Sequence, residues 1–219
     1  MSLVNQGEVN SLLTKLKNQL NVGLPNLINK SGLTNSLTAR GGTRVGSNLA
    51  NASANFITHG IIGIQSIDIT TLNVTNIQKS GTTTSGTFVF NANFKSPLKC
   101  ITQGVTRYKF LVTFANVGLN GKTRISNSTV MATGNFSVTE INNQINIDVF
   151  NFTRFNLHFG AIQTIVNISS RGLGQLRYPL IGRIVNYIRG NSIQQLHMEA
   201  QDELKAVIQQ QINTEIKSI

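Results

Sequence analysis

The chain of 219 residues is 40% hydrophobic, carries few charged residues (12%) and has a formal net charge of +11. This composition excludes a disordered chain, and no apolar run approaches the ~20 residues that a membrane-spanning helix needs. Cys100 is the single cysteine, which excludes an intrachain disulfide.

The N-terminal region predicts an amphipathic helix. Asn5 and Glu8 have the spacing of a capping box, and apolar residues then recur at helical intervals from Val9 to Leu20. Pro25 is expected to bend or end this helix. Residues 31–55 are rich in Gly, Ser, Asn and Thr, and we expect a long loop or a frayed edge strand there.

Residues 56–170 predict a run of antiparallel strands, because apolar and polar side chains alternate along them. The apolar parity changes between Ile69 and Leu72, which predicts a β-bulge at Thr70-Thr71. Residues 108–114 alternate as one further strand. Turns are expected at the following places: Lys79 to Gly86, Pro97, Asn120-Gly121, Asn142-Asn143 and Gly172 to Gly174.

The C-terminal region predicts two helices. Residues 173–190 form a helical connector that Gly190-Asn191 is expected to end. Ser192 and Gln195 then predict the capping box of a final helix of roughly seven turns. Its apolar stripe consists of Ile193, Leu196, Ala200, Leu204, Val207, Ile208, Ile212, Ile216 and Ile219. Because the order is helix, strands, helix, a parallel βαβ sheet is excluded and an α+β fold is expected.

The positive charge is unevenly distributed. The net charge is +3 over residues 1–78, +10 over 79–189 and −2 over 190–219. A basic middle segment would attract polyanions or anionic membranes. Its cations are scattered singly, however, and no nucleic-acid-binding motif is present. A soluble cationic surface is the simpler interpretation, and a preference for anionic lipid is the alternative.

No catalytic or metal-binding constellation is recognisable, so we expect a protein that is not an enzyme and needs neither metal nor cofactor. The three histidines, His59, His158 and His197, lie outside any known catalytic motif. Gly41-Gly42-Thr43-Arg44 could cradle an anion, although one glycine-rich stretch is a weak signal. Cys100 lies in a strand-like segment, where a buried and inert thiol is expected.

Seven Asn-X-Ser/Thr sequons suggest a secreted glycoprotein. A chain with 27 Asn would contain roughly five such sequons by chance, so this support is mild. Met1-Ser2-Leu3 has neither a basic region nor an apolar core, and we expect no signal peptide in this sequence. The candidate glycosylation sites are Asn29, Asn51, Asn73, Asn127, Asn135, Asn151 and Asn167.

The chain contains eleven Phe and no Trp, and most of the Phe alternate with polar residues. The simpler interpretation is an ordinary core between sheet and helix. The functional interpretation is an apolar cavity that binds a lipid or another hydrophobic ligand by burying its surface. The expected lining is Phe88, Phe90, Phe94, Phe110, Val112, Phe114, Phe136, Phe155, Phe159, Leu196, Leu204 and Ile208.

The C-terminal segment Leu176-Arg177-Tyr178-Pro179-Leu180-Ile181-Gly182-Arg183-Ile184-Val185 is followed by Gly190-Asn191-Ser192 and a long Gln-rich helix. This pattern resembles the group-seven mite allergens, which are related to takeout proteins, juvenile-hormone-binding proteins and the bactericidal/permeability-increasing family. The element order and the length agree with one such unit. The resemblance carries no diagnostic motif.

The resemblance implies a super-roll, in which a curved antiparallel sheet wraps around the long C-terminal helix and leaves an apolar tunnel or groove. It also implies a secreted arthropod carrier of lipids, fatty acids or terpenoid-like molecules. Hormone carriers and takeout proteins have a pair of cysteines near the N-terminus, which residues 1–99 lack. That difference favours the allergen-like branch.

We therefore predict a single elongated domain over residues 1–219, with an N-terminal helix region (1–30), strands (56–170) and C-terminal helices (173–219). Its expected partner is a hydrophobic small molecule or lipid held in the interior, and nucleic acid is not expected. A cationic defence protein that binds anionic membranes or bacterial lipid is the main alternative. A structural or surfactant secretion is a third.

Overall fold

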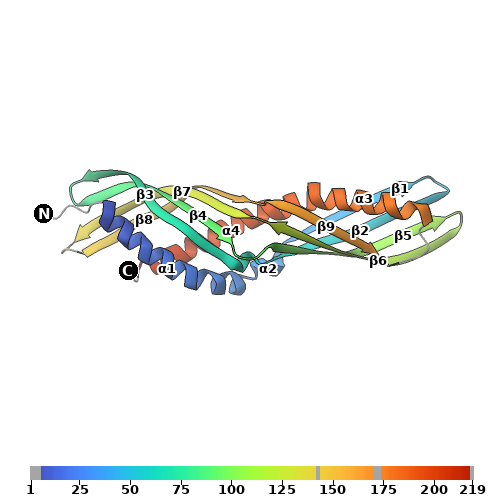
Figure 1. Ribbon diagram of the computed structural model, residues 1–219, viewed down its shortest axis with the longest axis horizontal. Helices are drawn as coiled ribbons and strands as arrows, with labels where there is room; N and C mark the ends of the chain where they lie inside the picture. The colour runs from blue at the N-terminus through green and yellow to red at the C-terminus, as the bar shows by residue number, and fades with distance from the viewer. Residues whose placement is uncertain (1–5, 142–143, 170–173, 218–219) are drawn as a thin grey trace.

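The computed structural model describes residues 6–141, 144–169 and 174–217 of an elongated molecule (Figure 1). The helices are α1 (Gln6–Ser31), α2 (Leu33–Ser36), α3 (Arg177–Tyr187) and α4 (Ile193–Glu215), with short 3-10 helices at Ile64–Ser66 and Gly174–Leu176. The strands are β1 (Thr38–Gly46), β2 (Ala50–Ile62), β3 (Ile67–Ser80), β4 (Thr83–Phe94), β5 (Leu98–Phe110), β6 (Thr113–Ser126), β7 (Thr129–Ile141), β8 (Gln144–His158) and β9 (Ala161–Ile168).

The strands form two antiparallel sheets placed end to end (Figure 1). Sheet A has the order β1-β2-β5-β6-β9, and sheet B has the order β3-β4-β7-β8. The chain passes from one sheet to the other four times, between β2 and β3, β4 and β5, β6 and β7, and β8 and β9. We call these crossings the waist; they comprise residues 63–66, 95–97, 127–128 and 159–160. The strand order is therefore preserved across the waist.

Sheet B is closed into a roll by two helices. Helix α1 packs along β3, α4 packs along β8, and the two helices pack against each other. The apolar faces of the helices meet the inner face of the sheet in one core. The core is crowded enough that Gly134 is required: a Cβ atom there would lie 2.4 Å from the ring of Phe88.

Side-chain amides of α1 and α4 form hydrogen bonds with backbone groups at the two edges of sheet B. On the β3 edge, Asn21 Oδ1 accepts from the backbone N–H of Ile69 at 2.7 Å, and Asn10 Oδ1 accepts from Val74 at 3.0 Å. On the β8 edge, Gln209 accepts from Phe152 N–H at 3.2 Å and donates to the carbonyl of Phe150 at 2.6 Å. Gln201 accepts from the N–H of Leu157 at 3.1 Å. The helices thus replace the missing neighbouring strands, as buried backbone groups need partners.

Sheet A is closed by α3, which packs against both β1 and β9. Arg183 donates to the carbonyl of Arg44 on β1 at 2.7 Å, and Arg177 donates to the carbonyl of Ile168 on β9 at 3.5 Å. Under α3, the rings of Phe56 and Tyr187 meet edge to face at 5.5 Å. Both rings cover Gly41, where a Cβ atom would come within 2.6 Å of each.

The expected architecture is confirmed: a curved antiparallel sheet, an N-terminal helix and a long C-terminal helix that runs along the interior (Figure 1). The stripe of the final helix is buried from Ile193 to Ile212, as expected from its spacing. The bulge at Thr70-Thr71 is present as a register shift between β3 and β4. Helix α1 continues through Pro25 to Ser31.

Two predictions about the C-terminal helices were wrong. Gly190-Asn191 does not end the first helix, because a π-helical segment (Ile188–Ser192) joins α3 to α4. Ser192 is itself helical and its side chain caps nothing, so the capping box with Gln195 is absent. Tertiary packing overrides the local stop signal here, since Ile188 and Ile193 on either side are buried.

Several strand boundaries also differ from expectation. For residues 31–55 the expected loop is wrong, because they contain the end of α1, α2, β1 and the start of β2. The alternative of an edge strand is confirmed in part, since β1 lies at the edge of sheet A. Asn120-Gly121 lies within β6, where buried Gly121 faces Thr102, and the hairpin turn falls instead at Leu111-Val112. Residues 108–114 are therefore two strands and a turn. The turn after Lys79 is confined to residues 81–82.

Some predictions lie outside the described residues. They are the helix cap at Asn5, the turn at Asn142-Asn143, the start of the turn at Gly172 and the last residue of the apolar stripe, Ile219. No described helix is both long and apolar enough to cross a membrane.

Candidate functional site

The interior of the sheet B half is an aromatic core. Phe88 and Phe150 stack with their ring centroids 3.9 Å apart. Phe152 contacts Phe88, Phe90 and Phe155 edge to face, each at 5.5 Å. Among the predicted lining residues, six are fully buried in this core or beneath it: Phe88, Phe90, Phe136, Leu196, Leu204 and Ile208.

Three further predicted residues lie at the margin of the core. Phe94, Phe155 and Phe159 are half-buried and pack against it. Phe159 contacts the ring of His197 at 4.8 Å, and the same histidine hydrogen-bonds the carbonyl of Leu157. His197 therefore helps to hold α4 on the edge of β8, which accounts for its position.

Phe110, Val112 and Phe114 do not lie in the interior, and their placement in the lining was wrong. They belong to the β5–β6 hairpin at the far end of sheet A, and Val112 is 89% exposed. The alternation of residues 108–114 was interpreted as one strand, whereas the chain reverses at Leu111-Val112. Reversal places the three side chains beyond the end of the core.

The interior of sheet A contains buried threonines among its apolar side chains. Thr58 and Thr102 share a buried hydrogen bond of 2.9 Å, and Thr123 and Thr164 share one of 3.1 Å. Thr106 is fully buried and its hydroxyl has no partner. The two halves of the roll therefore have different interiors, one rich in phenylalanine and one with threonines among mainly aliphatic residues.

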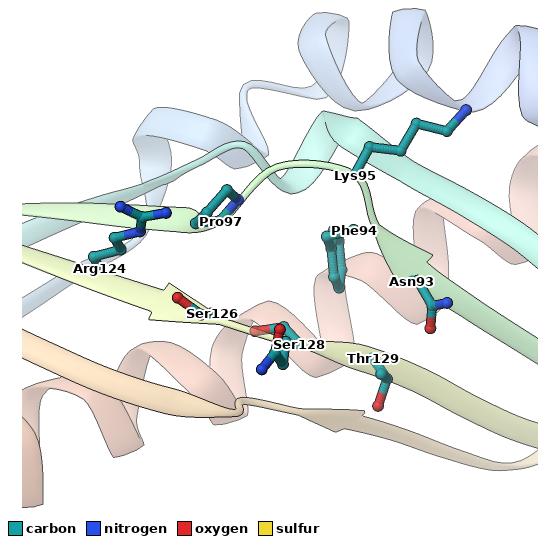
Figure 2. A pocket seen from close by; sticks show the side chains of 9 residues that line it. Asn93, Phe94, Lys95, Pro97, Arg124, Ser126, Ser128 and Thr129 are labelled. Atoms are coloured by element: carbon teal, nitrogen blue, oxygen red, sulfur yellow. The ribbon is translucent and has the colours of Figure 1, made fainter.

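A pocket of about 620 Å³ opens at the waist (Figure 2). The ladder between β4 and β7 ends at Asn93 and Thr129, and the ladder between β5 and β6 begins at Leu98 and Ile125. Residues 94–97 on one side and 126–128 on the other are not paired with each other across these two ladders, and the sheet parts between them. The lining residues are Asn93, Phe94, Lys95, Pro97, Arg124, Ser126, Asn127, Ser128 and Thr129.

The lining of the waist pocket contains the aromatic ring of Phe94 together with polar and charged side chains. Figure 2 shows Phe94 pointing into the opening between the two strand pairs, with α4 behind it. Ser128 is 4% exposed and its hydroxyl has no partner. Lys95 forms an ion pair with Asp68 at 2.9 Å. Arg124 forms no ion pair with any residue that the structure describes.

Exposed apolar side chains gather at the outer end of sheet A. We call Leu49, Phe110, Leu111, Val112 and Phe114 the apolar tip; all five are more than half exposed. The guanidinium of Arg107 lies 4.8 Å from the centre of the Phe114 ring, and Lys109 lies 5.8 Å from it. The apolar tip is therefore flanked by cations.

Charge is segregated between the two halves. The eight acidic residues of the chain all lie on α1, β3, β7, β8 and α4, which belong to the sheet B half. The strands of sheet A, α3 and the π-helical segment contain no acidic residue. They carry ten cations: Arg40, Arg44, Lys99, Arg107, Lys109, Lys122, Arg124, Arg177, Arg183 and Arg189. One half of the elongated molecule is thus strongly basic.

The remaining candidate residues are distributed as follows. Six sequon asparagines are exposed: Asn29, Asn73, Asn127, Asn135, Asn151 and Asn167. Asn51 is 8% exposed and its amide donates to the carbonyl of Ser47, so it is a poor glycan acceptor. Gly41 to Arg44 lie within β1, and the anion cradle expected there is wrong because the backbone amides follow an extended strand.

Chemically reactive groups are dispersed in the described part of the chain. No group of three or more His, Cys, Asp or Glu residues lies close enough there to hold a metal ion. His59, His158 and His197 lie on β2, β8 and α4. Cys100 is buried, as expected, and burial raises the pKa of its thiol to about 12. This thiol is not a nucleophile at neutral pH.

Sequence reasoning missed the amides that close sheet B and the phenylalanines at its centre, Phe150 and Phe152. The amides carried a usable signal, because Asn10, Asn21, Gln201 and Gln209 lie beside the apolar stripes of two amphipathic helices. The burial of Phe152 does not follow from simple alternation, because a register shift between β7 and β8 changes which residues of β8 face the interior. The waist pocket had no sequence signal, since it arises from a break in pairing.

No protein-family model matches the sequence, and no curated protein matches it. The solved structures that match the chain include the following two. Lipopolysaccharide binding protein has a TM-score of 0.42 and 10% identity, over 90% of this chain and 37% of that chain. Takeout 1 of Epiphyas postvittana has a TM-score of 0.32 and 9% identity, over 92% of this chain and 88% of that chain. This chain spans little more than a third of the lipopolysaccharide binding protein.

Proposed function

We propose that this protein binds a hydrophobic ligand, such as a lipid, a fatty acid or a terpenoid-like molecule, between sheet B and helices α1 and α4. The observation that carries the proposal is the way this apolar interior is enclosed. Two sides of the roll are helices attached to the sheet edges by separate amide hydrogen bonds, of Asn10, Asn21, Gln201 and Gln209. Such contacts can part locally, whereas a continuous strand ladder resists opening.

The interior is a packed apolar core, and it would offer apolar surface to a ligand once its side chains move apart. Phe88, Phe90, Phe150 and Phe152 face the buried stripe of α4. Contact with an acyl chain would stabilise a complex by about 25 cal/mol for each Å² of apolar surface removed from water. A ligand would enter by displacing side chains along the seam between the helices and the sheet.

The proposal is tested by native mass spectrometry of the purified protein, by solvent extraction and by displacement of a fluorescent fatty acid. We expect a defined stoichiometry and an apolar molecule in the extract. Ala132 pairs with Phe90 in the strand register, so Ala132→Phe would add a bulky ring to the core and should lower the amount of fatty acid bound. Phe88→Ala removes a ring from the core and should raise that amount. Wild-type protein that binds none of the fatty acids, lipids and terpenoids tested would contradict the proposal.

We propose in the same context that the protein is secreted. The exposed sequons support this, because their asparagines are accessible to the glycosylation machinery. Expression through a eukaryotic secretory pathway, followed by enzymatic deglycosylation, should reveal a mass shift. Glycan at Asn51 alone would contradict the assignment of accessible sites.

A second candidate function is binding to anionic membranes or bacterial lipid surfaces. The segregation of ten cations into the half that carries the apolar tip favours it. Leu111 adopts a left-handed backbone conformation (φ 54°) in a tight turn, where Asn or Gly would be less strained. A strained and exposed apolar turn flanked by cations suits insertion between lipid head groups. Salt-sensitive binding to anionic vesicles, without ligand uptake, would select this function.

A further inference from the structure

The waist pocket has a charge arrangement that calls for an anion. Arg124 on β6 lies directly opposite Lys99 on β5, and both side chains are exposed. Like charges opposite each other in an antiparallel pair repel and destabilise the sheet. On its other side Arg124 faces Gln163 of β9, which supplies no negative charge. A bound anion at Arg124 would relieve this repulsion.

Ser128 provides an independent indication of a ligand. Ser128 is one of the residues that line the pocket, and its hydroxyl is buried and has no hydrogen-bond partner. An unpaired buried hydroxyl costs about 1–3 kcal/mol, which a ligand oxygen could recover. Ser126, Thr129 and Asn127 place further hydroxyl and amide groups around the same opening. Guanidinium and hydroxyl donors together match a carboxylate or phosphate group.

The base of the pocket is apolar and adjoins the core. Phe94 points into the opening and packs against the buried core residues. Pro97 adds apolar surface on the same side. A ligand with an anionic group at Arg124 would therefore extend its apolar part over Phe94, toward the interior and α4.

We propose that the waist pocket binds the carboxylate or phosphate head group of a single-chain amphiphile, with Arg124 and Ser128 as the head-group donors and Phe94 as the first contact of the chain. This inference rests on the proposed function, because it locates the polar end of the ligand whose chain the interior would take. Lys95 is already paired with Asp68 and contributes less.

The test compares three probes by isothermal titration: lysophosphatidic acid below its micelle concentration, a monoacylglycerol with the same chain, and inorganic phosphate. Arg124→Gln should weaken binding of lysophosphatidic acid about tenfold, the value of one charge-assisted hydrogen bond. The same change should leave monoacylglycerol binding unaltered. Lys122→Gln is the matched control, because it removes one cation from the same face of β6 outside the waist pocket.

Amide NMR of the wild-type protein supplies a readout that does not depend on a variant. Lysophosphatidic acid should shift the amides of residues 93–97 and 126–129, and Phe94→Ala should weaken its binding while phosphate alone has little effect. If Arg124→Gln and Lys122→Gln weakened the binding of lysophosphatidic acid equally, the head-group assignment would be overturned. The same holds if wild-type protein bound monoacylglycerol as tightly as lysophosphatidic acid. Either result would leave the proposed function itself standing. Shifts with phosphate but not with lysophosphatidic acid would make the pocket a site for free anions and also overturn the head-group assignment. Absence of binding by both lipids would count against the proposed function as well.

Discussion

The backbone amide of Leu111 donates a hydrogen bond to the carbonyl oxygen of Leu49, with 2.8 Å between the two atoms. This bond joins the β5–β6 hairpin to the β1–β2 loop, so the apolar tip is a single surface built from two segments. Its apolar side chains are held together rather than presented on independent loops.

The apolar tip predicts a local effect on membrane binding. Val112→Asp should weaken binding to vesicles containing anionic lipid about tenfold or more, because it removes apolar surface and adds a like charge to the lipid. Val112 is almost fully exposed, so the fold should be unaffected. Sedimentation with phosphatidylglycerol vesicles at low salt measures the effect. Val22→Asp, at a valine on α1 that is 75% exposed, is the control and should cause little loss; equal losses would locate binding elsewhere.

The amides on the edges of sheet B predict a stability effect. Asn21→Ala leaves the Ile69 N–H without its partner, and Gln209→Ala leaves the Phe152 N–H and the Phe150 carbonyl without theirs. Each variant should lose about 1–3 kcal/mol in the free energy of unfolding, the cost of unpaired buried polar groups. Urea denaturation measures this. Gln210→Ala, at the exposed position next to Gln209, should change stability by less than about 0.5 kcal/mol; a loss similar to that of Gln209→Ala would contradict the edge-closing role.

The threonines inside sheet A predict opposite effects from the same substitution. Thr106→Val removes a buried hydroxyl that has no partner, and should stabilise the protein by roughly 1 kcal/mol. Thr58→Val breaks the hydrogen bond to Thr102 and should destabilise it by about 1–2 kcal/mol. The double variant Thr58→Val/Thr102→Val should recover most of that loss. Thermal unfolding of the three variants checks the order, and a destabilised Thr106→Val would show that its hydroxyl has a partner in solution.

Cys100 predicts a pH dependence at the alkaline end. Burial raises the pKa of its thiol from 9.0 to about 12. Between these values the folded state holds a proton that the unfolded state has lost, so stability is full below pH 9 and falls as the pH rises toward 12. The excess in unfolding free energy that wild type has over Cys100→Ala, which comes from packing, should therefore shrink as the pH rises above 9. A thiol reagent at pH 8 should modify Cys100 only after denaturation; rapid modification of folded protein would contradict its burial.

Sequence reasoning recovered the parts of the fold that depend on periodicity. The stripe of α4 and the alternation of Phe88, Phe90 and Ala92 repeat the same burial at every step, so local pattern and tertiary packing agree. Turns were less predictable. Asn120-Gly121 has strong turn propensity but lies within β6, because two long ladders on either side hold the strand straight.

The candidate site was partly accessible to the same reasoning. Phenylalanines of the predicted lining are buried in the interior where the strand parity is regular, and their contact with a ligand stays a prediction. Phe110, Val112 and Phe114 were misplaced where the chain reversed. The waist pocket depends on which strands pair on each side of Asn93 and Leu98, and that is long-range information. No short segment of the sequence indicates which distant strands will pair.

The amide contacts of α1 and α4 have a consequence for association between molecules. An uncovered strand at the border of a sheet offers a row of donors and acceptors to any other chain, and such borders seed fibrils. Here β3 and β8 present theirs to the protein's own asparagines and glutamines. Backbone groups bonded in this way are less available to a neighbouring molecule, so the amide-rich composition of the two helices acts as a safeguard against self-assembly.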